Sequence, residues 1–510
     1  MQVALPTEGD PQSVLETVFG YADFRAGQRE IIDAILAGRD CIGVMPTGAG
    51  KSLTFQVPAK LLGGTVLVLS PLISLMKDQV DGLERLGFRA AVFNSTLGEQ
   101  ERAQRLRELR SGVLELLYVA PEALGSGLRR VLEQCPIKLI VVDEAHCISH
   151  WGHDFRPAYR QLADLKSQFG DIPVLALTAT ATRRVAYDII RQLGMRKPAG
   201  YKGSFYRPNL RIVVHKKGTG RNTRNDILAL IRAHKGDSGI IYCATRKAVD
   251  ELTNWLLKQG IRALPYHAGL DDATRAAHQD YFAKDEIQVI VATVAFGMGI
   301  DKSNVRFVVH REMPRSIEAW YQEIGRAGRD GLQSDIVTFY SWKDVVDYAG
   351  FPSDSKDAEL QAEVRARTVA LFRMLDRTGC RHQALVGYFD EQIARCGASC
   401  DQCLGIGIAS LLSPKQTPRV DTTIRLGKPS WATQADVEPD ADLFDRLRTL
   451  RRQIADAEGV PAYIVFSDAV LRDMARKIPR TEDELLRVSG IGPHKAQRYG
   501  TRFLEVLRDA

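Results

Sequence analysis

Long apolar runs are absent from this sequence, and cysteine is scarce. No run approaches the ~18 residues that a membrane-spanning helix needs. The first twelve residues, MQVALPTEGDPQ, are acidic and have no long apolar core, so we expect no signal peptide. Eight cysteines in 510 residues do not suggest a disulfide framework. We therefore expect a cytoplasmic location.

A strong charge of either sign is also absent. The net charge is +7, and charged residues make up 26% of the chain. This slightly basic balance leaves two interpretations open: an ordinary solvated surface, or contact with a polyanionic partner. Hydrophobic residues make up 45% of the chain, which is typical of a soluble globular protein. At ~150 residues per domain, the length predicts about three or four domains.

Short apolar runs recur between residues 40 and 340, and amphipathic, helix-like segments lie between them. Continuous apolar strands that alternate with helices are typical of parallel sheets covered on both faces. Two α/β lobes fit so many runs better than one. The runs are residues 65–70, 114–121, 138–146, 174–180, 239–243, 287–293, 305–310 and 335–340. The segment GSFYRPNL (203–210) interrupts the pattern and is interpreted as a hinge.

The segment MPTGAGKS has the character of a phosphate-binding loop. Gly48 and Gly50 let the backbone approach a phosphate, and Lys51 can reach the β- and γ-phosphates of a nucleotide. The Ser52 hydroxyl is a suitable ligand for Mg²⁺. Met45 stands where the strict pattern has glycine, so the alternative is a glycine-rich turn before a helix.

A second motif, LIVVDEAH (139–146), ends an apolar strand in two carboxylates. Asp143 can hold Mg²⁺ through water, and Glu144 can orient and deprotonate an attacking water molecule. Acidic residues are also common where a helix begins after a strand, which is the competing interpretation. A phosphate loop and an Asp-Glu pair, each after an apolar strand, together favour nucleotide hydrolysis.

The segment YQEIGRAGRDG (321–331) lies in the expected second lobe. On a helix, Gln322, Arg326 and Arg329 would share one face. Two arginines that face a triphosphate from another lobe suit an arginine finger. A solvated basic helix face is the alternative, but the glycines of this segment argue against an ordinary surface helix.

Four of the cysteines are clustered near residue 400. Four thiolates can enclose Zn²⁺ tetrahedrally in a closed structural site. Buried free thiols are the alternative, and they suit the scattered cysteines better. The scattered cysteines are Cys41, Cys135, Cys147 and Cys243. The clustered cysteines, which we expect to bind zinc, are Cys380, Cys396, Cys400 and Cys403.

These segments, in this order, resemble those of the RecQ family of DNA helicases within helicase superfamily 2. The resemblance spans roughly residues 10 to 403 and resumes at 441. It runs through FRAGQREII (24–32), MPTGAGKS, SPLISLMKDQ (70–79), DEAHCISHWGHDFRP (143–157), LTATAT (177–182), ATVAFGMGID (292–301) and YQEIGRAGRDG.

The resemblance implies an α/β fold with two RecA-like parallel-sheet lobes. A helical zinc-binding module and a small all-α domain called HRDC would follow. The expected limits are 1–204 for the first lobe, 205–345 for the second, 346–405 for a helical arm and the zinc module, 406–440 for a linker and 441–510 for the HRDC domain.

The resemblance also implies roles for individual residues. The adenine of ATP would contact Phe24, Arg25 and Gln28. The phosphates would contact Thr47, Gly48, Gly50, Lys51 and Ser52. Mg²⁺ would be held by Ser52 and Asp143. The catalytic set would be Lys51, Asp143, Glu144, the finger Arg329 and its supporting residues Arg326 and Gln322.

In this family HCISHWGHDFRPAY (146–159) corresponds to an aromatic-rich loop between the ATP site and the DNA strand. Trp151 and Phe155 would stack on bases, at ~1–3 kcal/mol each. Arg156 would contact a phosphate or the hydrolysis site. Packing of one of these rings between the lobes is one alternative. The other is a metal site, whose ligands would be His146, His150 and His153.

Larger RecQ proteins carry a winged-helix domain after the zinc module, and here only residues 404–440 are available for it. That segment is too short, which casts doubt on the grip on duplex DNA. In the expected HRDC domain, SGIGPHK (489–495) would turn N–H groups outward to a DNA phosphate. Lys495, Arg498 and Arg502 would share the face of the helix that follows. A solvated basic face is the alternative.

The implied function is an ATP-dependent 3′-to-5′ DNA helicase that unwinds duplex DNA in repair and recombination. The expected partners are single-stranded DNA and tailed or forked duplexes, with single-strand-binding or recombination proteins as further candidates and no membrane. The expected location includes the bacterial nucleoid. The alternatives are a DNA-dependent ATPase or translocase with weak unwinding, and an ATP-independent strand-annealing protein.

Overall fold

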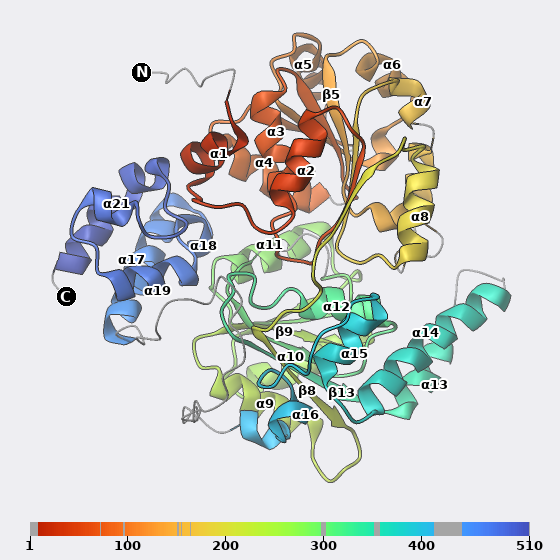
Figure 1. Cartoon of the computed structure of the whole chain (residues 1–510). Helices are drawn as coiled ribbons and strands as arrows, with labels where there is room; N and C mark the ends of the chain where they lie inside the picture. The colour runs from red at the N-terminus through yellow and green to blue at the C-terminus, as the bar shows by residue number, and fades with distance from the viewer. Residues whose placement is uncertain are drawn as a thin grey trace.

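The computed structural model describes residues 9–71, 73–94, 97–149, 152, 154, 156–163, 165–296, 302–350, 358–412 and 441–508. Within these ranges the chain forms two α/β lobes, helices beside the second lobe and a C-terminal helical domain (Figure 1). No described helix is both long and apolar enough to cross a membrane.

The first lobe is built on a seven-stranded parallel sheet in the order β3-β4-β2-β5-β6-β1-β7. Its strands are β1 (Cys41–Val44), β2 (Thr65–Leu69), β3 (Ala90–Phe93), β4 (Leu116–Val119), β5 (Ile137–Val142), β6 (Val174–Thr178) and β7 (Ala199–Lys202). The central strands are buried because they carry apolar side chains toward both faces.

Helices cover both faces of this sheet. One face holds α2 (Gln28–Leu36), α3 (Leu53–Leu61) and α4 (Ile73–Arg85). The other holds α5 (Glu99–Arg110), α6 (Ser126–Leu132), α7 (Leu165–Phe169) and α8 (Arg183–Gln192). Shorter turns are α1 (Pro11–Val14), η1 (Leu15–Phe19), η2 (Pro121–Ala123), η3 (Ala145–Ile148) and η4 (Pro157–Leu162).

The second lobe contains a six-stranded parallel sheet in the order β10-β11-β9-β12-β13-β8. Its strands are β8 (Leu210–Lys216), β9 (Ser238–Tyr242), β10 (Ala263–Tyr266), β11 (Val289–Ala292), β12 (Val305–His310) and β13 (Ser334–Tyr340). Its helices are α9 (Thr223–Ala233) and α10 (Arg246–Lys258) on one face, and α11 (Asp272–Ala283) and α12 (Ile317–Ile324) on the other.

The sequence located the centre of each sheet and missed its edges. All of the apolar runs that predicted strands coincide with strands. The strand expected before the phosphate loop is also present, as β1, and the strands that the sequence did not predict are β3, β7, β8 and β10. These are the edge strands of the two sheets. An edge strand is paired on one side only, so it needs fewer apolar residues and gives a weaker sequence signal.

Helices α13 (Trp342–Gly350), α14 (Ala358–Asp376), α15 (Arg381–Tyr388) and α16 (Asp401–Leu404) follow the second lobe, and a turn η5 (Ile408–Leu411) ends this part. Ile408 and Leu411 are buried against the second lobe, although the sequence placed them in a linker. Residues 413–440 of that expected linker lie outside the described residues.

The C-terminal domain has its own apolar core, formed by α17 (Ala441–Glu458), α18 (Ala462–Val465), α19 (Asp468–Lys477), α20 (Glu482–Leu485) and α21 (Pro493–Arg508). It lies against both lobes (Figure 1). A Cβ atom added to Gly20 of the first lobe would come within 2.4 Å of the Cα atom of Gly492. Arg448 and Arg452 donate hydrogen bonds to the carbonyl oxygens of Gly236 and Asp285 in the second lobe, at 2.7 and 2.9 Å.

Candidate active site and metal centre

The expected phosphate loop forms a turn between β1 and α3. Gly48 and Gly50 have φ values of +83° and +77°, which side-chain-bearing residues rarely adopt. The side chain of Gln28 donates from Nε2 to the carbonyl oxygens of Ala49 (3.2 Å) and Gly50 (2.9 Å). A Cβ atom on Gly50 would lie 2.5 Å from this nitrogen, so glycine is required there.

The residues expected at the adenine brace this loop. Gln28 is 1% exposed, and its Oε1 accepts a hydrogen bond from the backbone N–H of Arg25 at 2.8 Å. Arg25 in turn donates from Nη1 to the carbonyl oxygen of Gly48 at 2.5 Å. Phe24 is half-buried beside them. The shape of the loop therefore depends on Gln28 and Arg25, and their contact with adenine stays a prediction.

The two carboxylates lie where β5 ends, beside the loop. Burial and the neighbouring Glu144 raise the pKa of Asp143 to about 7, although Lys51 acts in the opposite direction. The Oε2 atom of Glu144 is buried and accepts no hydrogen bond from the described residues. Two adjacent carboxyl groups beside a phosphate loop fit a divalent cation, which Asp143 and the Ser52 hydroxyl could hold.

Glu144 is held in an unusual backbone conformation. Its φ is +47°, in the left-handed region, which costs a non-glycine residue of order 1–3 kcal/mol. The ring of His146 is buried beside it, with Nδ1 3.4 Å from Glu144 Oε2 and 3.0 Å from Thr178 Oγ1. Thr178 contacts Thr180, whose Oγ1 accepts a hydrogen bond from Gln322 of the second lobe at 3.3 Å. A chain of polar contacts thus connects the carboxylate with the other lobe.

The expected helix over residues 321–331 is only partly correct. Helix α12 ends at Ile324, and Arg326 and Arg329 lie in the turn that follows. They therefore share no helix face with Gln322. The helix ends here because glycine is unfavourable inside a helix. The glycine at position 325 also lets the turn approach Thr47 of the phosphate loop. The turn still places Arg329 at that loop, since a Cβ on Gly48 would lie 3.6 Å from its Cγ.

Sequence reasoning missed one residue at this interface, Arg207. It lies between β7 and β8 in the segment interpreted as a hinge. Its guanidinium group donates hydrogen bonds to the carbonyl oxygen of Thr47 in the phosphate loop. It also donates to the carbonyl oxygens of Ala327 and Gly328 in the turn that carries Arg326 and Arg329, residues 325–330, here called the arginine turn. The sequence signal that could have indicated this role is an arginine in the segment that joins the two lobes.

The aromatic-rich loop is only partly described. Trp151 and Phe155 lie outside the described residues, as do His150 and His153, so the stacking and metal interpretations stay predictions. Arg156 donates from Nε to Asp154 at 3.2 Å and from Nη1 to the carbonyl oxygen of Pro71 at 3.1 Å. Its second contact ties the loop to the segment SPLISLMKDQ.

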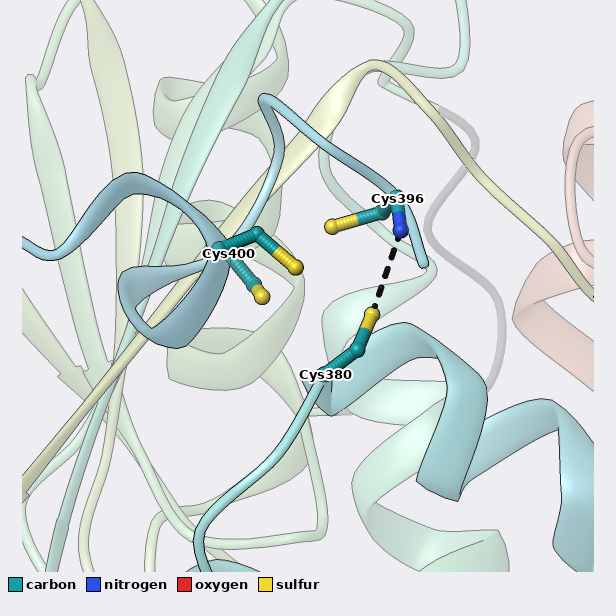
Figure 2. A group of neighbouring side chains, drawn as sticks. Cys380, Cys396 and Cys400 are labelled. Atoms are coloured by element: carbon teal, nitrogen blue, oxygen red, sulfur yellow. Dashed lines mark hydrogen bonds between the residues drawn. The ribbon is translucent and has the colours of Figure 1, made fainter. Parts of the chain in front are cut away.

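The four clustered cysteines come together as expected. Their Sγ atoms all lie within 4.8 Å of one another, and those of Cys380, Cys396 and Cys400 point toward one another in Figure 2. The backbone N–H of Cys396 donates to Cys380 Sγ at 3.3 Å. Burial acts against ionisation of Cys403, but hydrogen bonds with the neighbouring thiols lower its pKa to about 7. Four thiols at this separation fit a tetrahedral zinc site.

The scattered cysteines, Cys41, Cys135, Cys147 and Cys243, are free thiols. All are buried except Cys135, which is partly exposed. The cysteine cluster, by contrast, is joined to the edge of the second lobe. Ile212 of β8 pairs with Cys400, and the Ile212 N–H donates to the carbonyl oxygen of Ser399 at 3.0 Å.

The expectation that SGIGPHK turns its N–H groups outward is wrong. This turn packs on the first lobe, where Gly492 meets Gly20. Pro493 does begin a helix, but Lys495 donates from Nζ to the carbonyl oxygen of Ile464 at 2.9 Å. Arg498 forms an ion pair with Glu458 at 2.9 Å. DNA contact by Lys495 and Arg498 stays a prediction, and both side chains already have partners within the domain.

The phosphate loop of one parallel-sheet lobe, with Asp143 and Glu144 beside it, lies against the turn of a second such lobe that carries Arg326 and Arg329. This geometry defines the class of two-lobed motor proteins that hydrolyse nucleoside triphosphates, to which helicases of superfamily 2 belong. Solved structures agree on the fold. The DNA-bound DUF1998 helicase MrfA has a TM-score of 0.55 and 18% identity, over 67% of this chain and 52% of that one. The Mycobacterium smegmatis helicase Lhr has a TM-score of 0.52 and 21% identity, over 64% and 47%.

Comparison of the sequence with protein families narrows this class. The DEAD/DEAH box helicase family matches residues 25–189, the helicase conserved C-terminal domain 222–331, the RecQ zinc-binding family 342–404 and the HRDC domain 440–507. The chain is 37% identical to the ATP-dependent DNA helicase RecQ of Pasteurella multocida, over 99% of this chain and 94% of that protein. It is 36% identical to that of Bacillus subtilis, over 98% of each. The chain belongs to the RecQ family of helicases.

Proposed function

We propose that this protein is an ATP-dependent DNA helicase that moves 3′ to 5′ along one strand and unwinds tailed or forked duplexes in repair and recombination. The observation that carries the hydrolytic part is the contact between the phosphate loop and the arginine turn, beside Asp143 and Glu144. The names of the relatives support DNA as the substrate. The direction of movement follows from the family resemblance.

In this proposal the phosphate loop binds the triphosphate through its backbone N–H groups and Lys51. Glu144 orients the attacking water and accepts its proton, and the ring of His146 lies beside the carboxylate, 3.4 Å from its Oε2 atom. Arg329, supported by Arg326, stabilises the charge that develops on the transferred phosphoryl group. Ser52 and Asp143 would hold Mg²⁺, which would supply positive charge at the phosphates of the nucleotide.

The cysteine cluster binds structural Zn²⁺ in this proposal, since four thiols leave no open position for a substrate. DNA binding is assigned to the aromatic-rich loop, with Trp151 and Phe155 as stacking residues and Arg156 as a phosphate ligand. This loop begins at His146, two residues after Glu144, and Arg156 lies against Pro71. Occupancy by DNA can therefore alter the position of the catalytic carboxylate.

A second candidate function is a DNA-dependent translocase that unwinds weakly. The segment between the cysteine cluster and the HRDC domain is too short for a winged helix. The alignment with the Pasteurella relative extends over 602 positions, more than the 510 residues of this chain, so that relative carries additional segments. A helicase without a strand-separating element would still consume ATP on single strands.

The test measures unwinding and ATP consumption in the same samples, with a 3′-tailed duplex beside a 5′-tailed one. We expect only the 3′-tailed duplex to open. Glu144→Gln should lower the rate of hydrolysis by about 100- to 10,000-fold and abolish unwinding, because the general base is lost. Glu133→Gln removes an exposed carboxylate of the same lobe and serves as the matched control.

Each outcome decides between the candidates. Hydrolysis on single strands without unwinding of either duplex would favour the translocase. Opening of the 5′-tailed duplex alone would refute the direction. Unwinding or annealing that persists in Glu144→Gln would refute an ATP-driven mechanism and favour a strand-annealing protein.

A further inference from the structure

Arg207 joins three parts of the ATP site that are distant in the sequence. Its Nη1 donates to the carbonyl oxygen of Thr47 in the phosphate loop at 2.9 Å. Its Nη2 donates to the carbonyl oxygens of Ala327 and Gly328 in the arginine turn, at 3.1 and 2.8 Å. One planar group therefore spans the boundary between the two lobes, and both of its terminal nitrogens are used.

The charge of Arg207 is not neutralised by these contacts, because all three acceptors are carbonyl oxygens. Burial lowers the pKa of Arg207, and the nearby charges of Arg329 and Arg25 lower it further, although Tyr321 and Asp330 act in the opposite direction. Three arginines thus surround the phosphate loop. Arg207 is half-buried, and a cation that is partly removed from water among like charges is costly unless an anion is bound beside it. A nucleotide triphosphate on the loop would supply that negative charge.

Asn209 forms hydrogen bonds with both Arg207 and the arginine turn. Its Oδ1 accepts a hydrogen bond from Arg207 Nε at 3.2 Å. Its Nδ2 donates to the carbonyl oxygens of Gly328 at 2.9 Å and Leu332 at 3.0 Å. Gly328 has a φ of +58°, and a Cβ atom there would lie 2.5 Å from Asn209 Nδ2. The turn is therefore closely fitted to this side chain.

These contacts determine where Arg329 lies. It directly follows Gly328, whose carbonyl oxygen receives hydrogen bonds from both Arg207 and Asn209. A Cβ atom on Gly48 would lie 3.7 Å from the Cα atom of Arg329. Arg207 thus bonds the phosphate loop on one side and the turn that carries Arg329 on the other, so its contacts would affect the distance from Arg329 to the phosphates of a nucleotide on the loop.

We propose that Arg207 is a positioning residue for ATP hydrolysis: it couples the phosphate loop to the arginine turn and so delivers Arg329 to the γ-phosphate. Arg207 acts through Arg329, and the inference rests on the finger role proposed for Arg329. Since a misplacement of about 1 Å can cost a factor of about 100 in rate, loss of this contact should lower turnover far more than nucleotide binding.

The first test compares Arg207→Gln and Arg207→Lys in DNA-stimulated ATP hydrolysis. Arg207→Gln should lower kcat about 100-fold and leave KM for ATP nearly unchanged. Arg207→Lys should recover only part of kcat, because an ammonium group lacks the planar fork that spans the three carbonyls. Arg211→Gln is the matched control, since Arg211 pairs with Asp335 in the same lobe at 2.7 Å. It should lower thermal stability without a comparable loss of kcat.

The second test places Arg207→Gln in an Arg329→Ala background and measures single-turnover hydrolysis. If Arg207 acts through Arg329, the double variant should hydrolyse ATP no more slowly than Arg329→Ala alone. Losses that multiply would overturn the inference, and so would an Arg207→Gln variant that behaves like Arg211→Gln. If Arg329→Ala itself keeps the wild-type kcat, the finger role fails, which is a different result from failure of the coupling.

Discussion

Single buried residues in the second lobe make its stability sensitive to pH. His234 is buried between two carboxylates, with Nδ1 3.0 Å from Asp237 and Nε2 2.9 Å from Asp335. Burial opposes the charged ring, but the two hydrogen bonds outweigh it and raise the pKa of His234. Burial likewise opposes ionisation of Asp335, yet hydrogen bonds with His234 and Arg211 lower its pKa to about 2.

The sign of the pH effect follows from these directions. A histidine whose pKa is raised by folding stabilises the folded state fully below its unfolded pKa of about 6.5 and loses this effect as pH rises through the folded pKa. We therefore expect the free energy of unfolding to fall from about pH 6 to about pH 8.5 and His234→Asn to reduce that fall. Unfolding by denaturant at both pH values, with wild type and variant, measures the free energy of unfolding. His494→Asn, which changes an exposed histidine, should leave the pH dependence intact; an equal effect of both variants would contradict the assignment.

At the scale of elements, the cysteine cluster stabilises helices that are too short to be stable alone. Helices α15 and α16 have 8 and 4 residues. They are joined by a buried ion pair between Arg381 and Asp401 at 2.8 Å, and His382 contacts the carbonyl oxygens of Leu210 and Ser399. The cluster thus connects two short helices to the edge strand β8.

Loss of one cluster thiol should therefore release the metal and destabilise this edge of the second lobe. We expect Cys396→Ser to lose bound zinc and at least about 2 kcal/mol of stability, or about 4–8 °C in Tm. Metal analysis of the purified protein and a thermal melt measure the two effects. Cys135→Ser changes a partly exposed cysteine outside the cluster and should keep both zinc and Tm. Wild-type protein that carries no zinc would refute the assignment.

At the scale of the whole molecule, the HRDC domain contacts both lobes at once. Its turn at Gly492 meets Gly20 of the first lobe, and Arg448 and Arg452 reach the second. The approach at Gly20 leaves no room for a side chain. Docking should therefore fail when a single methyl group is added there.

Two glycines provide a matched comparison for this contact. Gly20 and Gly38 both have a φ of +72°, so alanine costs about the same backbone strain, ~1 kcal/mol, at either position. Nothing lies within 4 Å of a Cβ atom on Gly38, whereas one on Gly20 would meet the backbone of Gly492. We expect Gly20→Ala to increase the radius of gyration in small-angle X-ray scattering and Gly38→Ala to leave it unchanged. Identical scattering curves would show that the domain does not dock in this way in solution.

The sequence by itself determined what depends on local composition. Apolar runs gave the central strands, since a strand buried on both faces must be apolar throughout. The motifs around Lys51, Asp143 and Glu144 were recognisable because phosphate and Mg²⁺ require particular residue types at short spacings. The four cysteines near residue 400 were recognisable for the same reason.

Only the tertiary structure decided how distant segments meet. The turn that carries Arg326 and Arg329, the interlobe contact of Arg207 and the docking of Gly492 on Gly20 all bring together residues far apart in the chain. Each depends on a close approach of two backbone segments, which glycine permits because it has no side chain. The position of a glycine in the sequence does not show which segment will approach it. The order of residue types in the sequence therefore predicts which chemical groups a site contains. The packing of the lobes determines which of these groups lie close enough together to act on one ligand.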